Sequence, residues 1–288
     1  MLTTNLKLNY QRIQRFNRDP RTPDRLIAHY LLERQLAEQL REAPSEERTR
    51  VAGEVYSRLF AELPDHPMNH AVGERPRPER HARYLLPHLG QDVRFLEIGT
   101  GDGSLARYLA GKCKSVLAID VTDALKPAAD APQNFRFALT PGITIDAEDG
   151  SIDLAFSNQV MEHLHPDDAA AQLREVHRVL RSGGLYICRT PHRMLGPSDI
   201  SCYFDDVATG FHLKEYTFRE LTDLMKSTGF RSVRYRIEGA GRVWWAAPAR
   251  IMIVAETAFS LISKGAREAL RHNVIVGVLL GMNAIARK

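Results

Sequence analysis

The spacing of apolar residues divides the chain into three parts. Between residues 24 and 62, apolar side chains such as Leu36 and Leu40 recur at helical spacing. From about residue 79, short apolar runs alternate with helical stretches, and beyond residue 241 apolar and basic residues are mixed. We therefore predict an N-terminal helical extension and linker (1–78), a central domain (79–240) and a basic amphipathic helical tail (241–288).

The central part has the pattern of alternating strands and helices. Strands are predicted over 93–98, 115–119, 135–139, 152–156, 185–188 and 233–237, and helices over 104–109, 167–180 and 218–228. Such alternation favours a parallel sheet covered by helices on both faces. The predicted fold class is therefore α/β, a doubly wound and mostly parallel sheet with helical additions at both ends.

The amino-acid composition excludes some classes of protein, and the C-terminal residues differ in net charge from the central ones. A chain of 288 residues with 44% hydrophobic and 26% charged side chains excludes a disordered protein or a disulfide-rich scaffold. Residues 231–288 hold 10 basic and 3 acidic side chains, a balance of +7, whereas residues 91–230 carry 14 and 20, a balance of −6. The tail is either a peripheral membrane contact, a surface that packs on the domain or on a second copy, or a solvated helix face. An acidic centre without a recognition motif argues against nucleic acid.

Several classes of protein are excluded by absent patterns. Three cysteines give neither a disulfide framework nor metal-ligand spacing, and no set of acids and histidines has metal spacing either, so no metal is predicted. The apolar stretches near the C-terminus are too short or too interrupted to span a bilayer. We expect a cytoplasmic protein, with the inner membrane face as an alternative location for the tail.

A glycine-rich loop carries the clearest chemical signal. Residues 97–103 read Glu-Ile-Gly-Thr-Gly-Asp-Gly between a predicted strand and a predicted helix, and the next strand ends at Asp120. Glycines there let the backbone approach a ligand, and an acid at that strand end can accept hydrogen bonds from ribose hydroxyls. The spacing Gly-x-Gly-x-Gly differs from the dinucleotide fingerprint, and Glu97 would repel a pyrophosphate. An amino group suits Glu97, which favours S-adenosylmethionine over NAD.

At this point the chain resembles a known family. Residues 93–190 look like a class I S-adenosylmethionine-dependent methyltransferase of the group that includes the ubiquinone-biosynthesis methyltransferases. The likeness rests on the glycine loop, on Ser-Ile-Asp-Leu-Ala-Phe-Ser at 151–157 with Val-Met-Glu-His-Leu at 160–164, and on Arg-Val-Leu-Arg-Ser-Gly-Gly at 178–184. A helix and strand start within 212–230 extend it, so that it covers roughly residues 80–237.

The resemblance implies a cofactor site, residue by residue. Glu97 would hold the amino group of S-adenosylmethionine, Asp120 its ribose, and Val121 would pack near the adenine. The loop residues Gly99, Thr100, Gly101 and Gly103 would line the methionine end, and Asn158 and Gln159 would border the sulfonium. The family often has an acid near the adenine after the third strand, where this chain has Ala-Leu-Thr at 138–140.

The sequence indicates the catalytic and substrate residues less clearly than the cofactor site, because methyl transfer mainly needs alignment of donor and acceptor. His163, just after the fourth strand, is the candidate general base for a hydroxyl acceptor, and packing under the next helix is the alternative. The long polar segment 189–215 is a candidate substrate lid. Its candidate contacts are Arg189, His192, Tyr203 and His212.

The sequence thus predicts a methyltransferase acting on a small-molecule acceptor. We expect the acceptor to be a hydroxyl of a sugar, a glycan or a lipid-linked molecule, because the predicted lid is polar and the tail has membrane-binding character. Carbon or nitrogen methylation of a small metabolite is the alternative within the enzyme class. A regulator that binds S-adenosylmethionine without catalysis is the alternative outside it.

Overall fold

The structure of the protein is a computed structural model. It describes residues 5–66, 78–123, 131–141, 143–239, 242–271 and 273–288. Most of the predicted linker between the first two parts lies outside these residues.

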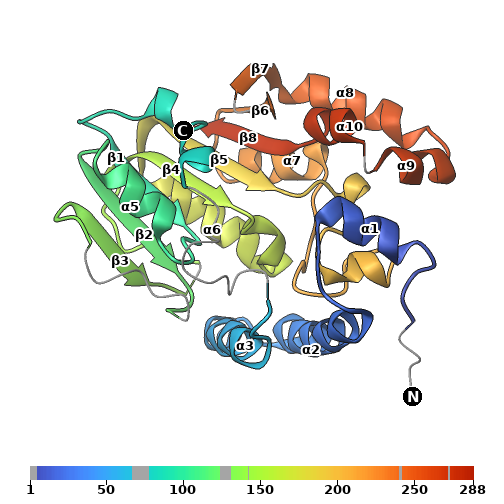
Figure 1. The fold of residues 1–288 in the computed structure, drawn as a ribbon. Helices are drawn as coiled ribbons and strands as arrows, with labels where there is room; N and C mark the ends of the chain where they lie inside the picture. Colours follow the sequence, from blue (N-terminus) through green and yellow to red (C-terminus); the bar gives the residue numbers. More distant parts are fainter. Residues whose placement is uncertain (1–4, 67–77, 124–130, 142, 240–241, 272) are drawn as a thin grey trace.

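A single mixed sheet organises the molecule (Figure 1). The described strands follow the order β3-β2-β1-β4-β5-β8-β6-β7. Their bounds are β1 Arg94–Ile98, β2 Ser115–Asp120, β3 Phe135–Leu139, β4 Ile152–Asn158, β5 Leu180–Thr190, β6 Ser232–Gly239, β7 Arg242–Pro248 and β8 Met282–Arg287. Strands β1 to β5 pair in parallel, while β8 is antiparallel to both β5 and β6. The predicted α/β class with a mostly parallel sheet is confirmed.

Helices cover both faces of this sheet. The described helices are α1 Tyr10–Asn17, α2 Pro23–Glu42, α3 Arg48–Glu62, α4 Pro78–Ala82, α5 Ser104–Ala110, α6 Pro166–Val179, α7 Phe218–Ser227, α8 Ala249–Ser260, α9 Lys264–Leu270 and α10 Val274–Leu279, with short 3-10 turns η1 Leu86–His88, η2 Met161–His163, η3 Arg193–Leu195 and η4 Ile200–Tyr203. Apolar residues of α6, α7 and α8 pack on one face, and those of α4 and α5 on the other. Each face therefore has its own apolar core.

Local sequence explains where the helices begin. Thr217 and Glu220 form a reciprocal capping box at the start of α7, and Pro166 occupies the first turn of α6 behind the His165 cap. Gly103 caps α5 with a left-handed backbone (φ 69°). The sheet order reverses at β1, between β2 on one side and β4 on the other. Ligands of open α/β sheets bind at the carboxyl ends of the strands beside such a reversal.

The C-terminal part differs from the predicted helical tail. Residues 242–248 and 282–287 are strands, and β8 lies inside the sheet, between β5 and β6. Ala284 and Ala286 are fully buried there. Small apolar residues have weak strand propensity of their own, so the strand is decided by long-range pairing that local periodicity does not reveal. Among the described residues of this part, the helices are α8 to α10.

The N-terminal helices pack across the end of the sheet (Figure 1). Leu36 and Leu40 of α2 and Leu59 of α3 form a third apolar cluster with Phe211. A fourth cluster joins α1 and α2 to η4, where the Tyr30 and Phe204 rings stack with centroids 4.1 Å apart. The extension is therefore built onto the segment that follows β5. None of the described helices is long and apolar enough to cross a membrane.

Candidate functional site

A large cavity opens at the carboxyl ends of β1 and β4. Its volume is about 950 Å³, which is within the ordinary range for small-molecule sites. The glycine loop and the ends of β2 and β4 form one wall. Helices α2 and α3 and the segment from Ser198 to Leu213 form the others. The sequence predicted the first wall and the lid, but not the contribution of the N-terminal helices.

The glycine loop meets the cavity through its first two glycines. Gly99 (φ 68°) and Gly101 (φ 57°) both have left-handed backbones and both line the space. A Cβ at Gly99 would stand 2.4 Å from Cγ2 of Val160, which is shorter than any van der Waals contact. The loop therefore keeps its backbone close to the cavity and to the segment after β4.

Asp120 fastens the loop to the end of β2. The amide of Gly101 donates to its Oδ2 (2.8 Å), and the amide of Val121 donates to its Oδ1 (2.8 Å). Burial raises the pKa of Asp120, although these amides act in the opposite direction. Asp120, Val121, Asn158 and Gln159 all line the cavity, as the predicted cofactor site requires. Gln159 adopts a left-handed backbone (φ 57°), an unusual conformation for a non-glycine residue.

Three predicted cofactor residues, Glu97, Thr100 and Gly103, belong to the loop but do not line the cavity. Glu97 is buried, and its Oε2 accepts the hydroxyl of Thr100 (2.9 Å). Burial raises the pKa of Glu97 to about 8. Gly103 begins α5. Because Glu97 faces Thr100 and the start of α5, its place in the structure favours a role in shaping the loop over direct contact with an amino group.

A buried cluster joins the segment after β4 to the segment after η4. Glu162, His163 and His212 each offer one ligand-type atom, and these atoms lie within 4.8 Å of one another. Burial and the neighbouring His212 lower the pKa of His163 to about 3, and burial raises the pKa of Glu162 to about 7. Burial alone would lower the pKa of His212, but Glu215 and Glu162 raise it to about 9. The predicted base, His163, is thus one of three coupled groups.

The four predicted substrate residues divide into two pairs. Tyr203 and His212 line the cavity. Arg189 instead donates to Oδ1 of Asn283 in β8 (2.8 Å), and its guanidinium lies 5.4 Å from the centre of the Tyr84 ring. His192 is buried against Glu256 of α8, with Nε2 3.0 Å from Oε2. Arg189 and His192 therefore hold elements together away from the cavity, a role that their polar character did not reveal.

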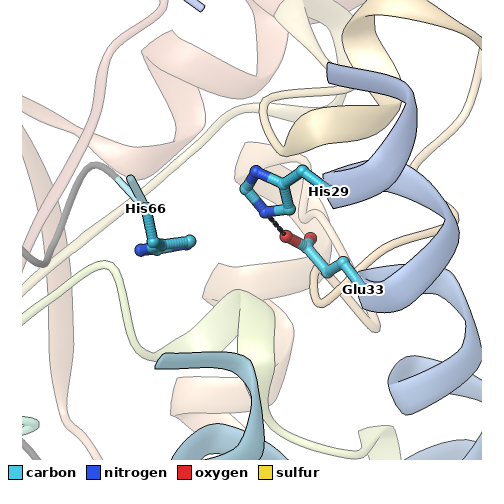
Figure 2. A group of neighbouring side chains, drawn as sticks. All are labelled: His29, Glu33 and His66. Atoms are coloured by element: carbon cyan, nitrogen blue, oxygen red, sulfur yellow. Dashed lines mark hydrogen bonds and ion pairs between the residues drawn. The ribbon is translucent and has the colours of Figure 1, made fainter. Parts of the chain in front are cut away.

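The sequence missed the polar residues that α2 contributes. His29 Nε2 lies 2.7 Å from Oε2 of Glu33, and Oε1 of Glu33 accepts the amide of Phe211 (2.9 Å). Figure 2 shows this pair on α2, with the His66 ring on the opposite side of the space between them. Burial lowers the pKa of His66 to about 4. The spacing of His29 and Glu33, one helical turn apart among buried apolar residues, was the available signal.

The predicted lid is held in place by the N-terminal helices. Arg41 of α2 donates to the carbonyls of Thr209 (3.2 Å) and Gly210 (2.9 Å). On α3, Arg48 pairs with Asp168 at the start of α6 (2.8 Å). These contacts close the cavity on the side opposite the sheet.

Comparison with known proteins identifies the central domain. Residues 96–188 match the family model described as "Methyltransferase domain". A protein of Mycolicibacterium smegmatis named "Probable S-adenosylmethionine-dependent methyltransferase" is 33% identical over 143 residues, covering 49% of this chain and 52% of the relative. A sarcosine/dimethylglycine N-methyltransferase of Halorhodospira halochloris is 37% identical over 117 residues, covering 37% and 40%. The chain thus spans about half the length of the curated relatives it matches, or less.

Solved structures agree on the fold. The chain is similar to a Burkholderia thailandensis 1,6-didemethyltoxoflavin-N1-methyltransferase with bound S-adenosylhomocysteine, with a TM-score of 0.51 and 19% identity over 85% of this chain and 91% of that one. It is also similar to a Haemonchus contortus phosphoethanolamine N-methyltransferase, with a TM-score of 0.52 and 16% identity over 86% and 61%. Residues 96–188 therefore belong to the class I S-adenosylmethionine-dependent methyltransferase family, whose cofactor is S-adenosylmethionine.

Proposed function

We propose that this protein transfers a methyl group from S-adenosylmethionine to a small polar acceptor enclosed in the 950 Å³ cavity. The observation that carries the proposal is the continuity of that cavity. It runs from the glycine loop and Asp120, past Asn158 and Gln159, to the polar residues of α2 and of the segment after β5. Donor and acceptor would share one enclosed space, which is what alignment and exclusion of water require.

The cavity wall fits S-adenosylmethionine. The left-handed glycines Gly99 and Gly101 let the backbone approach the methionine part, and Asp120 offers carboxylate lone pairs to the ribose hydroxyls. Val121 would pack near the adenine, while Asn158 and Gln159 would border the sulfonium. Glu97, Thr100 and Gly103 would shape the loop without lining the cavity. When bound, the cofactor supplies an electrophilic methyl group.

The acceptor end favours a hydroxyl-bearing molecule. His163 and His212 line it from one side, and Tyr203 donates its hydroxyl to Asp19 (2.9 Å) on another. We infer that these groups position the acceptor oxygen facing the donor. A sugar, a glycan or the headgroup of a lipid-linked molecule carries such hydroxyls.

Labelled S-adenosylmethionine incubated with cell extract tests the proposal. We expect a small labelled product whose new bond is a methyl ether. An N-methyl or C-methyl product would support methyltransferase activity but reject a hydroxyl as the acceptor group. Cofactor binding in calorimetry without any labelled product would reject catalysis in favour of a binding protein.

We also propose a lipid surface as the partner of the C-terminal part. Large apolar side chains are exposed on β7 and α8 to α10, among them Trp244 (60% exposed), Leu261 (83%) and Val274 (74%). Arg242 and Arg250 are exposed in the same part, and residues 231–288, which include it, have a charge balance of +7. Aromatic and aliphatic anchors with basic neighbours suit an anionic membrane surface.

A further inference from the structure

The side chain of Glu162 is buried with one oxygen unused. Its residue exposure is 0%, and Thr190 donates its hydroxyl to Oε2 (2.8 Å). Oε1 has no hydrogen-bond partner among the residues that the structure describes. An unsatisfied buried carboxylate oxygen is costly, so native structures keep one where an ion, a water or a ligand completes it.

The two neighbouring histidines both have their Nδ1 atoms engaged. Nδ1 of His163 lies 3.0 Å from the carbonyl oxygen of Phe211, which can only accept, so Nδ1 carries a proton. Nδ1 of His212 lies 2.8 Å from Oε1 of Glu215, and a carboxylate likewise favours a proton there. Metal binding displaces any second proton of an imidazole, so that Nε2 can then offer its lone pair to the ion. Hydrogen bonds of this kind, to a carbonyl or a carboxylate, are how metal-ligating histidines are oriented in proteins.

We propose that Glu162, His163 and His212 bind one divalent transition-metal ion of the zinc type in the wall of the acceptor cavity. The ligands would be Oε1 of Glu162 and Nε2 of each histidine, and one ligand atom from each residue already lies within 4.8 Å of the others. Ligands about 2.0–2.2 Å from a zinc ion are separated by roughly 3–4 Å, so only small side-chain shifts are required. Two imidazoles and one carboxylate suit zinc, cobalt or iron(II) better than magnesium or calcium.

The charge around this cluster favours a cation. Asp199 and Glu215 flank His212 with two further carboxyl groups. The aromatic rings of Tyr56 and Phe211 limit the access of water from the side of α3, with the Tyr56 and His163 ring centroids 6.1 Å apart. Three protein ligands leave at least one coordination position, and His163 and His212 line the cavity into which it would open.

A second cluster, His29, Glu33 and His66, has the same residue types but a different environment. The Arg21 guanidinium contacts Nδ1 of His29. Because a guanidinium can only donate, this contact leaves the proton of His29 on Nε2, directed at Glu33 (2.7 Å). Glu33 has partners for both oxygens. The Arg21 guanidinium therefore already lies beside His29 and Glu33, and both oxygens of Glu33 are hydrogen-bonded. We expect no metal ion to bind there, so this cluster is the matched control for metal binding.

The consequence of the metal site rests on the proposed function. A hydroxyl oxygen of the acceptor at the open position would be oriented toward the donor, and a bound divalent ion would favour loss of its proton to solvent. The new oxygen–methyl bond would form as the bond between the methyl carbon and the sulfonium sulfur breaks, which leaves S-adenosylhomocysteine. In that arrangement, the imidazoles hold the ion and Glu215 keeps His212 in the tautomer that it needs.

Titration of chelator-treated protein with zinc chloride, followed by calorimetry, tests the site without any acceptor. We expect one equivalent of zinc to bind, with magnesium chloride giving at least ~100-fold weaker binding, as the donor set implies. Glu162→Gln and His212→Gln should each weaken zinc binding by at least ~100-fold, whereas His66→Gln should leave it unchanged. S-adenosylhomocysteine affinity shows whether each variant is folded.

The outcomes separate this inference from the proposed function. Wild-type protein that binds no zinc, or loss of binding in His66→Gln as large as in Glu162→Gln, overturns the site even if methyl transfer occurs. Glu215→Gln is the positioning variant, expected to weaken zinc by ~10–100-fold. It should also alter the visible spectrum of the cobalt-loaded protein, which a merely structural role would not change. An unaltered cobalt spectrum would contradict the assigned role of Glu215.

Discussion

The buried carboxyl group of Glu97 in the glycine loop makes the free energy of unfolding depend on pH. Its pKa is raised to about 8 by burial, from an unfolded value of 4.5. A raised folded pKa means that its favourable contribution is complete below pH 4.5 and is lost as the pH rises toward 8. The group therefore lowers the free energy of unfolding progressively across this window.

Glu97→Gln should remove that pH dependence, because the amide keeps the shape and does not ionise. We expect little difference from the wild type at pH 5 and a gain of about 1–3 kcal/mol in the free energy of unfolding at pH 8, since one pKa unit corresponds to 1.36 kcal/mol. Urea unfolding at both pH values measures it. Equal stabilities at pH 8 would mean that Glu97 is not the buried acid described above.

A substitution at Gly99 tests whether the glycine loop contributes to cofactor binding. Gly99→Ala combines a left-handed backbone with a Cβ 2.4 Å from Val160, so the loop must move. We expect the Kd for S-adenosylhomocysteine to rise at least ~10-fold, the equivalent of about 1.4 kcal/mol. Gly111→Ala is the control, since a Cβ there meets nothing within 4 Å. Equal Kd values for the two variants would remove Gly99 from the site.

The local sequence pattern was sufficient to predict where the loop residues lie, but not which way their side chains point. The glycines and Asp120 follow strand ends, so sequence order alone predicts that they meet at one edge of the sheet. The direction of Glu97 depends on α5 packing behind the loop, and the roles of Arg189 and His192 depend on β8 and α8. Those partners are 64 to 94 residues away along the chain. No window of neighbouring residues contains that information.

At the scale of elements, the sequence predicted the helix α3 but not that it forms part of the cavity wall. The side chain of Arg48 is 14% exposed and joins α3 to the start of α6 through Asp168 (2.8 Å), with Asp167 as a second partner (3.2 Å). Thr49 donates its hydroxyl to the carbonyl of Pro141 (3.3 Å) after β3. The helix thus connects the segments on either side of the predicted cofactor site.

Arg48→Ala should loosen this wall by breaking its link to α6. We expect the Kd for S-adenosylhomocysteine to rise ~3–30-fold, because breaking a half-buried charge pair costs roughly 1–2 kcal/mol. Faster dissociation in stopped flow should account for most of the change. Arg50→Ala on the same helix is matched, since Arg50 pairs only on the surface with Glu47 and Glu54. Equal effects of the two variants would show that α3 does not retain the ligand.

At the scale of the molecule, the two ends of the chain have different relations to the central domain. The N-terminal helices complete the cavity through Glu33, Tyr56 and their neighbours. The C-terminal part adds β7 and β8 to the sheet and leaves apolar side chains on α8 to α10 exposed. The overall charge of +4 therefore comes from the ends and not from the acidic domain between them.

The exposed apolar side chains of the C-terminal part lead to the last prediction, at the level of the whole protein. Trp244→Ser combined with Leu261→Ser should reduce binding to vesicles of anionic phospholipid at least ~10-fold, since burying each such side chain contributes about 1.5–3 kcal/mol. Wild-type binding should be weaker on zwitterionic vesicles and should fall with added salt, because basic residues such as Arg242 and Arg250 contribute through screened attraction.

Vesicle co-sedimentation measures this binding, with Val207→Ser as the control. Val207 is 66% exposed but belongs to the segment after η4 and not to the C-terminal part. Its substitution removes a comparable apolar side chain and should leave vesicle binding unchanged. If the wild type ignores vesicles and sediments as a dimer that the double variant dissociates, a second copy of the chain is the partner of these side chains. Because α8 contacts the core that supports the cavity, methyl transfer measured with and without vesicles would then report whether the surface influences the site.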